Sequence, residues 1–99
     1  MTWRSRKLLD HIHACPECFV CGQVNTGGNI VPAHSNQSRD GKGKGLKAHD
    51  YRIAALCNSC HTQLDQGNKW TLAEKRMIFD EAHRATIGWL IESGALQVK

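Results

Sequence analysis

Cys18-Phe-Val-Cys21-Gly22 and Cys57-Asn-Ser-Cys60 are the two stretches of sequence that decide the fold. In each, two residues separate a pair of cysteines, and this spacing lets neighbouring thiolates bind the same tetrahedral ion. Two such pairs complete a shell of four sulfur ligands, which leaves no open position for a substrate. The spacing therefore predicts a structural zinc ion, bound by Cys18, Cys21, Cys57 and Cys60.

Cys15 is the fifth cysteine, and it makes the first pair ambiguous because Cys15-Pro-Glu-Cys18 has the same spacing. Gly22 favours Cys18 and Cys21, since a glycine after the second cysteine relieves the tight turn of such a loop. Cys15 is then a spare thiol or a neighbour of the metal site. A redox protein that cycles Cys15 and Cys18 is an alternative, and it requires the zinc to be absent.

Length, composition and charge set the general class. The 99 residues suffice for one domain, residues 1–99, but a domain this short buries too little apolar surface to be very stable by packing alone. An odd number of cysteines, five, with Cys-x-x-Cys spacing fits metal binding better than a closed set of disulfides, which implies a reducing compartment. No apolar run is long enough for a signal peptide or a membrane span, so we expect a soluble, cytoplasmic protein. A net charge of +4 suggests an anionic partner.

The region around the cysteine pairs predicts a strand, a loop, a strand and a helix. Residues 29–34 and 51–56 are apolar strand candidates, and Pro32 restricts the first of them to an edge or irregular position. A loop covers residues 35–50 between them. A short helix follows over about residues 58–66 and stops at Gly67.

Helices are expected on both sides of this unit, which makes the fold class α+β. Apolar residues at helical spacing predict a helix over residues 5–14, with His11 and His13 on its surface. Thr71-Leu-Ala-Glu74 is a capping box and Gly94 a C-terminal cap, so a second helix spans about 71–93. Trp70 and Trp89 are expected to pack rather than to stack on bases. The expected apolar side of the second helix consists of Leu72, Met77, Phe79, Ala82, Ile87, Leu90 and Ile91.

The 35 residues between the two cysteine pairs, residues 22–56, exceed the spacing of roughly 15 to 20 found in plain zinc ribbons. They contain His34 at the end of the first strand and His49-Asp50 before the second. His61 directly follows the last cysteine, and Asp65 lies four residues further on the short helix. Side chains four apart project from one face of a helix, so His61 and Asp65 can bind one ion together. This pattern predicts a second, open metal site.

The loop carries four basic residues among three glycines, Arg39, Lys42, Lys44 and Lys47. Backbone amides and ammonium groups can approach a phosphate backbone closely in such a segment, so we interpret it as a DNA-contacting flap. An ordinary solvated loop is the alternative.

Four motifs in this order resemble the HNH (ββα-metal) endonucleases, and more closely the small phage-type nucleases of the YbcO kind. The resemblance covers roughly residues 15–93. The motifs are Pro32-Ala-His34-Ser-Asn-Gln, Asp40-Gly-Lys-Gly-Lys-Gly-Leu-Lys-Ala-His-Asp50, Cys57-Asn-Ser-Cys-His61 and Leu64-Asp65-Gln-Gly67.

The resemblance implies a zinc-stabilised ββα-metal core at about residues 18–67 and cleavage of DNA phosphodiester bonds, in a protein of phage or prophage origin that acts in the host cell. His34 would be the general base, and His61 and Asp65 would hold the catalytic ion. The carboxylate of Asp65 replaces an imidazole of the family, which favours Mg²⁺ or Mn²⁺. No organic cofactor is implied.

Two positions depart from the family pattern. Many HNH sites have a metal ligand immediately before the base, where this chain has Ala33. The middle asparagine is replaced by Arg52, so its role passes to His49 or Asp50, with Asn36 as a further candidate. A zinc-stabilised DNA-binding module without catalysis is the alternative function, and the choice between monomer and homodimer stays open.

Overall fold

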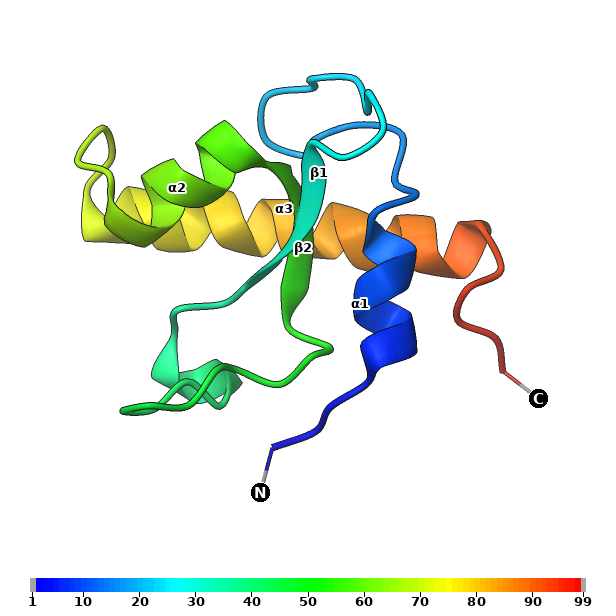
Figure 1. The fold of residues 1–99 in the computed structure, drawn as a ribbon. Helices are drawn as coiled ribbons and strands as arrows, with labels where there is room; N and C mark the ends of the chain where they lie inside the picture. The colour runs from blue at the N-terminus through cyan, green and yellow to red at the C-terminus, as the bar shows by residue number, and fades with distance from the viewer. Residues whose placement is uncertain (1, 99) are drawn as a thin grey trace.

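The structure is a computed structural model that describes residues 2–98, and it shows a small α+β protein (Figure 1). These residues form three α-helices, a two-stranded sheet and a short 3-10 helix. None of the described helices combines the length and the apolar character needed to span a bilayer. In chain order the elements are α1 (Arg6–Ile12), β1 (Ile30–His34), η1 (Ser38–Asp40), β2 (Ile53–Cys57), α2 (Asn58–Gln66) and α3 (Leu72–Glu92).

The two strands pair antiparallel, with Ile30 opposite Cys57 at one end and His34 opposite Ile53 at the other. Every residue of β2 is buried because α3 crosses behind the sheet, while α2 and α1 lie on either side of the strands (Figure 1). A strand rises about 3.4 Å per residue, so the two ends of β1 are roughly 14 Å apart. The register therefore places Cys57 at one end of the sheet and His34 at the other.

Helix α3 has both caps that the sequence predicts. The Thr71 hydroxyl accepts a hydrogen bond from the Glu74 N–H at 3.1 Å, and the Glu74 carboxylate accepts one from the Thr71 N–H at 2.8 Å. Beyond the last turn Gly94 has a φ of +84°, in the left-handed region that closes helices. Local capping chemistry thus determines where this helix begins and ends.

The buried face of α3 is narrower than expected. It consists of Phe79, Ala82, Thr86 and Leu90, with Ile78, Ile87 and both tryptophans of the region, Trp70 and Trp89, packed against the core. The prediction for Leu72, Met77 and Ile91 was wrong, because they are 64%, 67% and 58% exposed. A sheet of two strands covers only one narrow stripe of a long helix, so apolar residues beside that stripe stay in water.

Helix α1 is shorter than the expected span of residues 5–14, and the glycine after α2 has a different backbone conformation from the one expected. Helix α1 begins after Ser5, whose hydroxyl accepts a hydrogen bond from the Leu8 N–H at 3.3 Å, and it ends at Ile12. Helix α2 stops before Gly67 as expected, but this glycine has a φ of −79° and is not left-handed. Glycine is required there for space, since an added Cβ would lie 2.8 Å from the Cα of Gln63.

Replacing Thr71 by alanine should lower the free energy of unfolding by about 1 kcal/mol, the usual cost of losing a helix N-cap side chain. Urea denaturation of the zinc-loaded protein measures it. Thr62→Ala is the matched control, because Thr62 is an exposed residue inside α2 and alanine has the higher helix propensity. Equal stabilities for Thr71→Ala and wild type would contradict the capping role.

Candidate metal centres and active site

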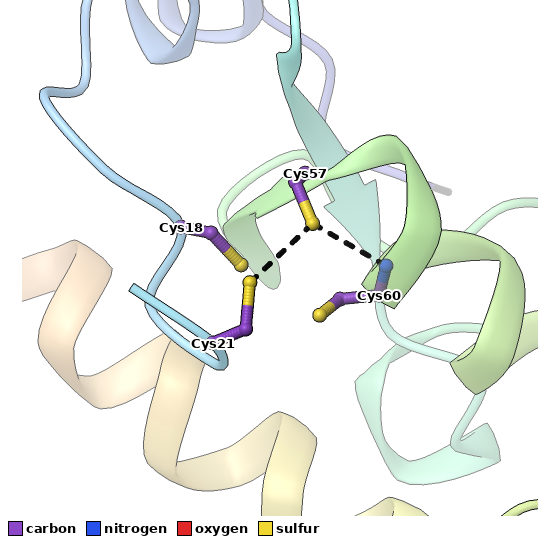
Figure 2. A group of neighbouring side chains, drawn as sticks. All are labelled: Cys18, Cys21, Cys57 and Cys60. Atoms are coloured by element: carbon purple, nitrogen blue, oxygen red, sulfur yellow. Dashed lines mark hydrogen bonds between the residues drawn. The ribbon is translucent and has the colours of Figure 1, made fainter. Parts of the chain in front are cut away.

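Four cysteines meet where the turn after α1 approaches the junction of β2 and α2 (Figure 2). The sulfur atoms of Cys18, Cys21, Cys57 and Cys60 all lie within 4.8 Å of one another. The Sγ atoms of Cys21 and Cys57 are 3.7 Å apart. Sulfurs on one tetrahedral zinc with bonds of about 2.3 Å are separated by roughly 3.8 Å. The arrangement is therefore suited to a four-sulfur metal site.

Backbone geometry preforms both halves of this cluster. Gly22 has a φ of +78° and closes a turn in which its N–H donates to the Cys18 carbonyl at 2.9 Å. This is the tight turn for which the sequence requires a glycine. The Val20 N–H donates to the Cys18 sulfur at 3.4 Å, and the Cys60 N–H donates to the Cys57 sulfur at 3.5 Å (Figure 2 shows the second bond).

The thiols of the cluster differ in how readily they ionise. Burial opposes a charge on Cys18, but hydrogen bonds from backbone N–H groups and from Cys21 outweigh it and lower its pKa to about 7. Burial and the neighbouring thiols raise the pKa of Cys60 far above its ordinary value. Four thiolates at this separation repel one another unless a positive ion lies between them. The residues present thus fit a structural zinc.

Cys15 lies outside the four-sulfur cluster. Its side chain is fully buried, and its thiol donates to the Glu17 carbonyl at 3.3 Å. Burial raises the pKa of this thiol, which makes it a poor nucleophile. Cys18 and Cys21 therefore form the first pair of the cluster, and Cys15 is a structural thiol beside it.

At the opposite end of the sheet, His34 contacts a buried carboxylate. Its Nε2 lies 2.8 Å from Oδ1 of Asp50, whose side chain is 3% exposed. Burial disfavours the charge on Asp50, but hydrogen bonds from His34, the Ser5 N–H and Arg4 hold the pKa of this carboxyl below its usual range. An ionised carboxylate only accepts hydrogen bonds, so His34 must donate from Nε2. Its Nδ1 is then the nitrogen that can accept a proton.

His61 and Asp65 contact each other on α2. The separation between His61 Nε2 and Asp65 Oδ2 is 3.1 Å, and neighbouring ligands of an octahedral ion with bonds of about 2.1 Å lie roughly 3.0 Å apart. The side-chain amide of Asn36 donates to the other carboxylate oxygen of Asp65 at 2.8 Å. The pair therefore forms a direct side-chain contact on one face of α2, and Asn36 holds the carboxylate from the β1 side.

One open hollow of about 380 Å³ joins the two groups, because His34, Asn36, His61 and Asp65 all line it. Lys42 and Lys47 line the same hollow. The structure thus brings together residues from β1, from the following loop and from α2. Among these four residues the most distant in sequence, His34 and Asp65, are 31 positions apart. His34, the His61–Asp65 pair and two lysines thus share one open surface.

Other residues singled out in the sequence lie elsewhere. His49 accepts a hydrogen bond at Nδ1 from the Trp3 N–H and stacks on Tyr51, with ring centroids 4.9 Å apart. Arg39 forms an ion pair of 2.7 Å with Asp80 of α3. Neither residue lines any of the hollows that His34 lines.

Two further positions complete the placement of the predicted residues. Lys44 is exposed at the tip of the loop, in a turn closed by hydrogen bonds between Gly43 and Leu46. Ala33, which stands where many HNH sites have a ligand, is 2% exposed in the core.

Sequence reasoning missed two partners of Asp50. Arg4 and Ser5 both donate hydrogen bonds to its carboxylate, from 46 and 45 residues away. No motif connects these positions, so only the folded chain reveals the contact.

Comparisons of the chain with protein-family models, with curated proteins and with solved structures gave no match.

Proposed function

We propose that the protein is a metal-dependent endonuclease of the HNH type that hydrolyses DNA phosphodiester bonds. The observation that carries this proposal is the position of His34. It is backed by a buried carboxylate and shares one hollow with the His61–Asp65 pair. In this proposal β1, β2 and α2 are the ββα-metal core, and the four-cysteine site holds its structural zinc.

His34 would act as the general base. Asp50 keeps a proton on Nε2 and leaves the lone pair of Nδ1 to accept a proton from the water that attacks the phosphorus atom. The imidazolium that forms is stabilised by the adjacent carboxylate. Asp50 thus has the role of an orienting and charge-stabilising group, of the kind found in catalytic triads.

His61 and Asp65 would hold the divalent ion, through one nitrogen and one carboxylate oxygen. Asn36 orients the carboxylate by donating to its second oxygen. Oxygen ligands favour Mg²⁺ or Mn²⁺ in such a site. When bound, this ion would neutralise charge on the scissile phosphate and stabilise the leaving oxygen.

The cationic surface around His34 favours a polyanionic substrate. A second hollow of about 550 Å³ lies beside the first and is lined in part by Arg6 and Leu46. His34 and Lys47 line both hollows, so a nucleic acid strand that occupies them would pass next to His34. Lysine contacts to phosphates position a strand without reading its sequence. Arg39 would contact the strand only after its ion pair with Asp80 is broken.

The test is cleavage of supercoiled plasmid by zinc-loaded protein with Mg²⁺, Mn²⁺ or EDTA. We expect nicking only with an added ion, and we expect Asp65→Asn to reduce it more than about 100-fold at low ion concentration, since even outer groups of metal sites contribute 10- to 100-fold. The matched control is Asp10→Asn, an exposed residue of α1.

Two results would contradict the proposal. The first is DNA that is retarded on a gel but never cut with any of the ions, which identifies a zinc-stabilised DNA-binding module. The second is equal cleavage by Asp65→Asn and wild type.

A further inference from the structure

Residues 3–5, which we call the N-terminal strap, lie across the segment 47–50 that carries Asp50. The Trp3 N–H donates to Nδ1 of His49 at 3.0 Å, and the Trp3 carbonyl accepts from the Asp50 N–H at 3.0 Å. The rings of Trp3 and Tyr51 also contact each other, with centroids 5.7 Å apart. The strap is thus attached to the loop through its backbone and its side chains.

Arg4 connects the strap to three positions of this segment. Its Nη1 donates to the Ala48 carbonyl at 2.5 Å and to Oδ1 of Asp50 at 3.0 Å. Its Nη2 donates to the Lys47 carbonyl at 2.9 Å. A planar guanidinium can make such bonds together, whereas the single ammonium group of a lysine cannot reproduce the fork. Arg4 therefore fixes the strap to this segment, although its side chain is 41% exposed and also lines the second hollow beside His34.

Both oxygens of the Asp50 carboxylate are engaged. Oδ1 accepts from His34 and Arg4, and Oδ2 accepts from the Ser5 N–H at 2.7 Å. The side chain is 3% exposed, so water cannot easily replace a lost donor. Ser5 is at the same time the N-cap of α1, which fixes the end of the strap to a helix. The orientation of the carboxylate that faces His34 is consequently set by residues 4 and 5.

We propose that the N-terminal strap belongs to the catalytic machinery. Arg4 and the backbone N–H of Ser5 are positioning groups that orient Asp50 and thereby keep His34 in the tautomer with its proton on Nε2. This inference rests on the proposed role of His34 as general base. It adds a segment outside the ββα-metal core to the set of residues on which the reaction depends.

The test compares Arg4→Gln and Arg4→Lys with wild type, each loaded with zinc. The first readout is the tautomer of His34, measured by two-bond ¹H–¹⁵N correlation without DNA. The second is kcat and KM for cleavage of a duplex oligonucleotide with Mg²⁺ or Mn²⁺. Arg84→Gln is the control, because this exposed arginine of α3 lines none of the hollows around His34.

We expect the Nε2–H tautomer in wild type and a mixture of tautomers in Arg4→Gln. The kcat of this variant should fall about 10- to 100-fold with KM nearly unchanged, a smaller loss than the roughly 10⁴-fold caused by a wrong histidine tautomer in a serine protease. Arg4→Lys keeps the charge without the fork, so we expect an intermediate effect. Arg84→Gln should behave as wild type.

Three outcomes distinguish a positioning role of Arg4 from a phosphate contact, and each from a failure of the nuclease proposal. A folded, zinc-loaded Arg4→Gln with an unchanged His34 tautomer and unchanged kcat overturns the positioning role. A raised KM with unchanged kcat overturns it too, in favour of a phosphate contact. In the third outcome, Arg4→Gln shifts the tautomer of His34 but the wild-type protein never cuts DNA. This result supports the action of the strap on His34 and overturns the nuclease proposal.

Discussion

Protein in which Cys57 is replaced by serine should lose its zinc and be unfolded at room temperature. A structural zinc site contributes about 10–16 kcal/mol in small zinc-binding domains at neutral pH, which is as large as the whole stability of about 5–15 kcal/mol of a typical domain. Serine is a good helix N-cap and can replace the hydrogen bond that the Cys57 sulfur accepts from the Cys60 N–H. The loss of structure would therefore report the loss of the metal ligand.

Elemental analysis and far-ultraviolet circular dichroism measure the two effects together. Wild type should contain about one zinc per chain and unfold when a strong chelator removes it. Cys15→Ser is the matched control, because Cys15 is equally buried but only donates to the Glu17 carbonyl, which a serine hydroxyl can also do. Retention of zinc by Cys57→Ser, or its loss from Cys15→Ser, would show that the cluster is composed differently.

Replacing His34 by alanine should reduce DNA cleavage by about 10²- to 10⁴-fold, the usual contribution of a general base. The protein should remain folded, since the His34 side chain is 16% exposed and lies at the end of β1 away from the zinc cluster. Single-turnover cleavage of a duplex oligonucleotide at saturating enzyme measures the chemical step separately from binding. Zinc content and the circular dichroism spectrum check the fold.

His13→Gln serves as the control for His34→Ala. His13 is also a histidine next to the sheet, but it is exposed and bonds to the Ile30 carbonyl at 3.0 Å, far from the hollow. We expect its cleavage rate to equal that of wild type. If His34→Ala cut DNA as fast as His13→Gln, another group would have to activate the water, and the proposed role of His34 would be wrong.

The two expected effects are separable because the two centres lie at opposite ends of the same short sheet. In the proposed nuclease, loss of a cysteine ligand should act on folding and should therefore remove DNA binding as well as cleavage. Loss of His34 should act on the chemical step alone and leave zinc content, fold and DNA affinity in place. The comparison of the two variants therefore distinguishes the structural metal site from the proposed catalytic one.

The sequence by itself determined the features that depend on neighbouring residues. The spacing of two cysteines predicted the pairs that meet in the cluster, and Gly22 selected the first pair because a left-handed turn is needed there. Thr71 and Glu74 predicted the start of α3, since a capping box is complete within one helical turn. Each of these features involves only a few neighbouring residues, so the sequence predicts it without knowledge of the tertiary structure.

Only the tertiary structure decided which group contacts His34. His49, Asp50 and Asn36 were equal candidates by spacing, but the loop turns Asp50 inward, directs His49 to Trp3 and leaves Asn36 on Asp65. A loop of 16 residues, 35–50, can take many paths at little cost in closure entropy. Its sequence therefore does not specify which of its side chains points to the end of β1.

The strap and the buried face of α3 depend on long-range packing as well. Arg4 is 46 positions from Asp50, and no periodic pattern relates two such residues. The apolar residues of α3 extend around more of the helix than a two-stranded sheet can cover, so Met77 and Ile91 are exposed while Thr86 is buried and bonded to the Ala55 N–H. Periodicity shows which residues can be buried, but burial itself depends on what the rest of the chain places opposite them.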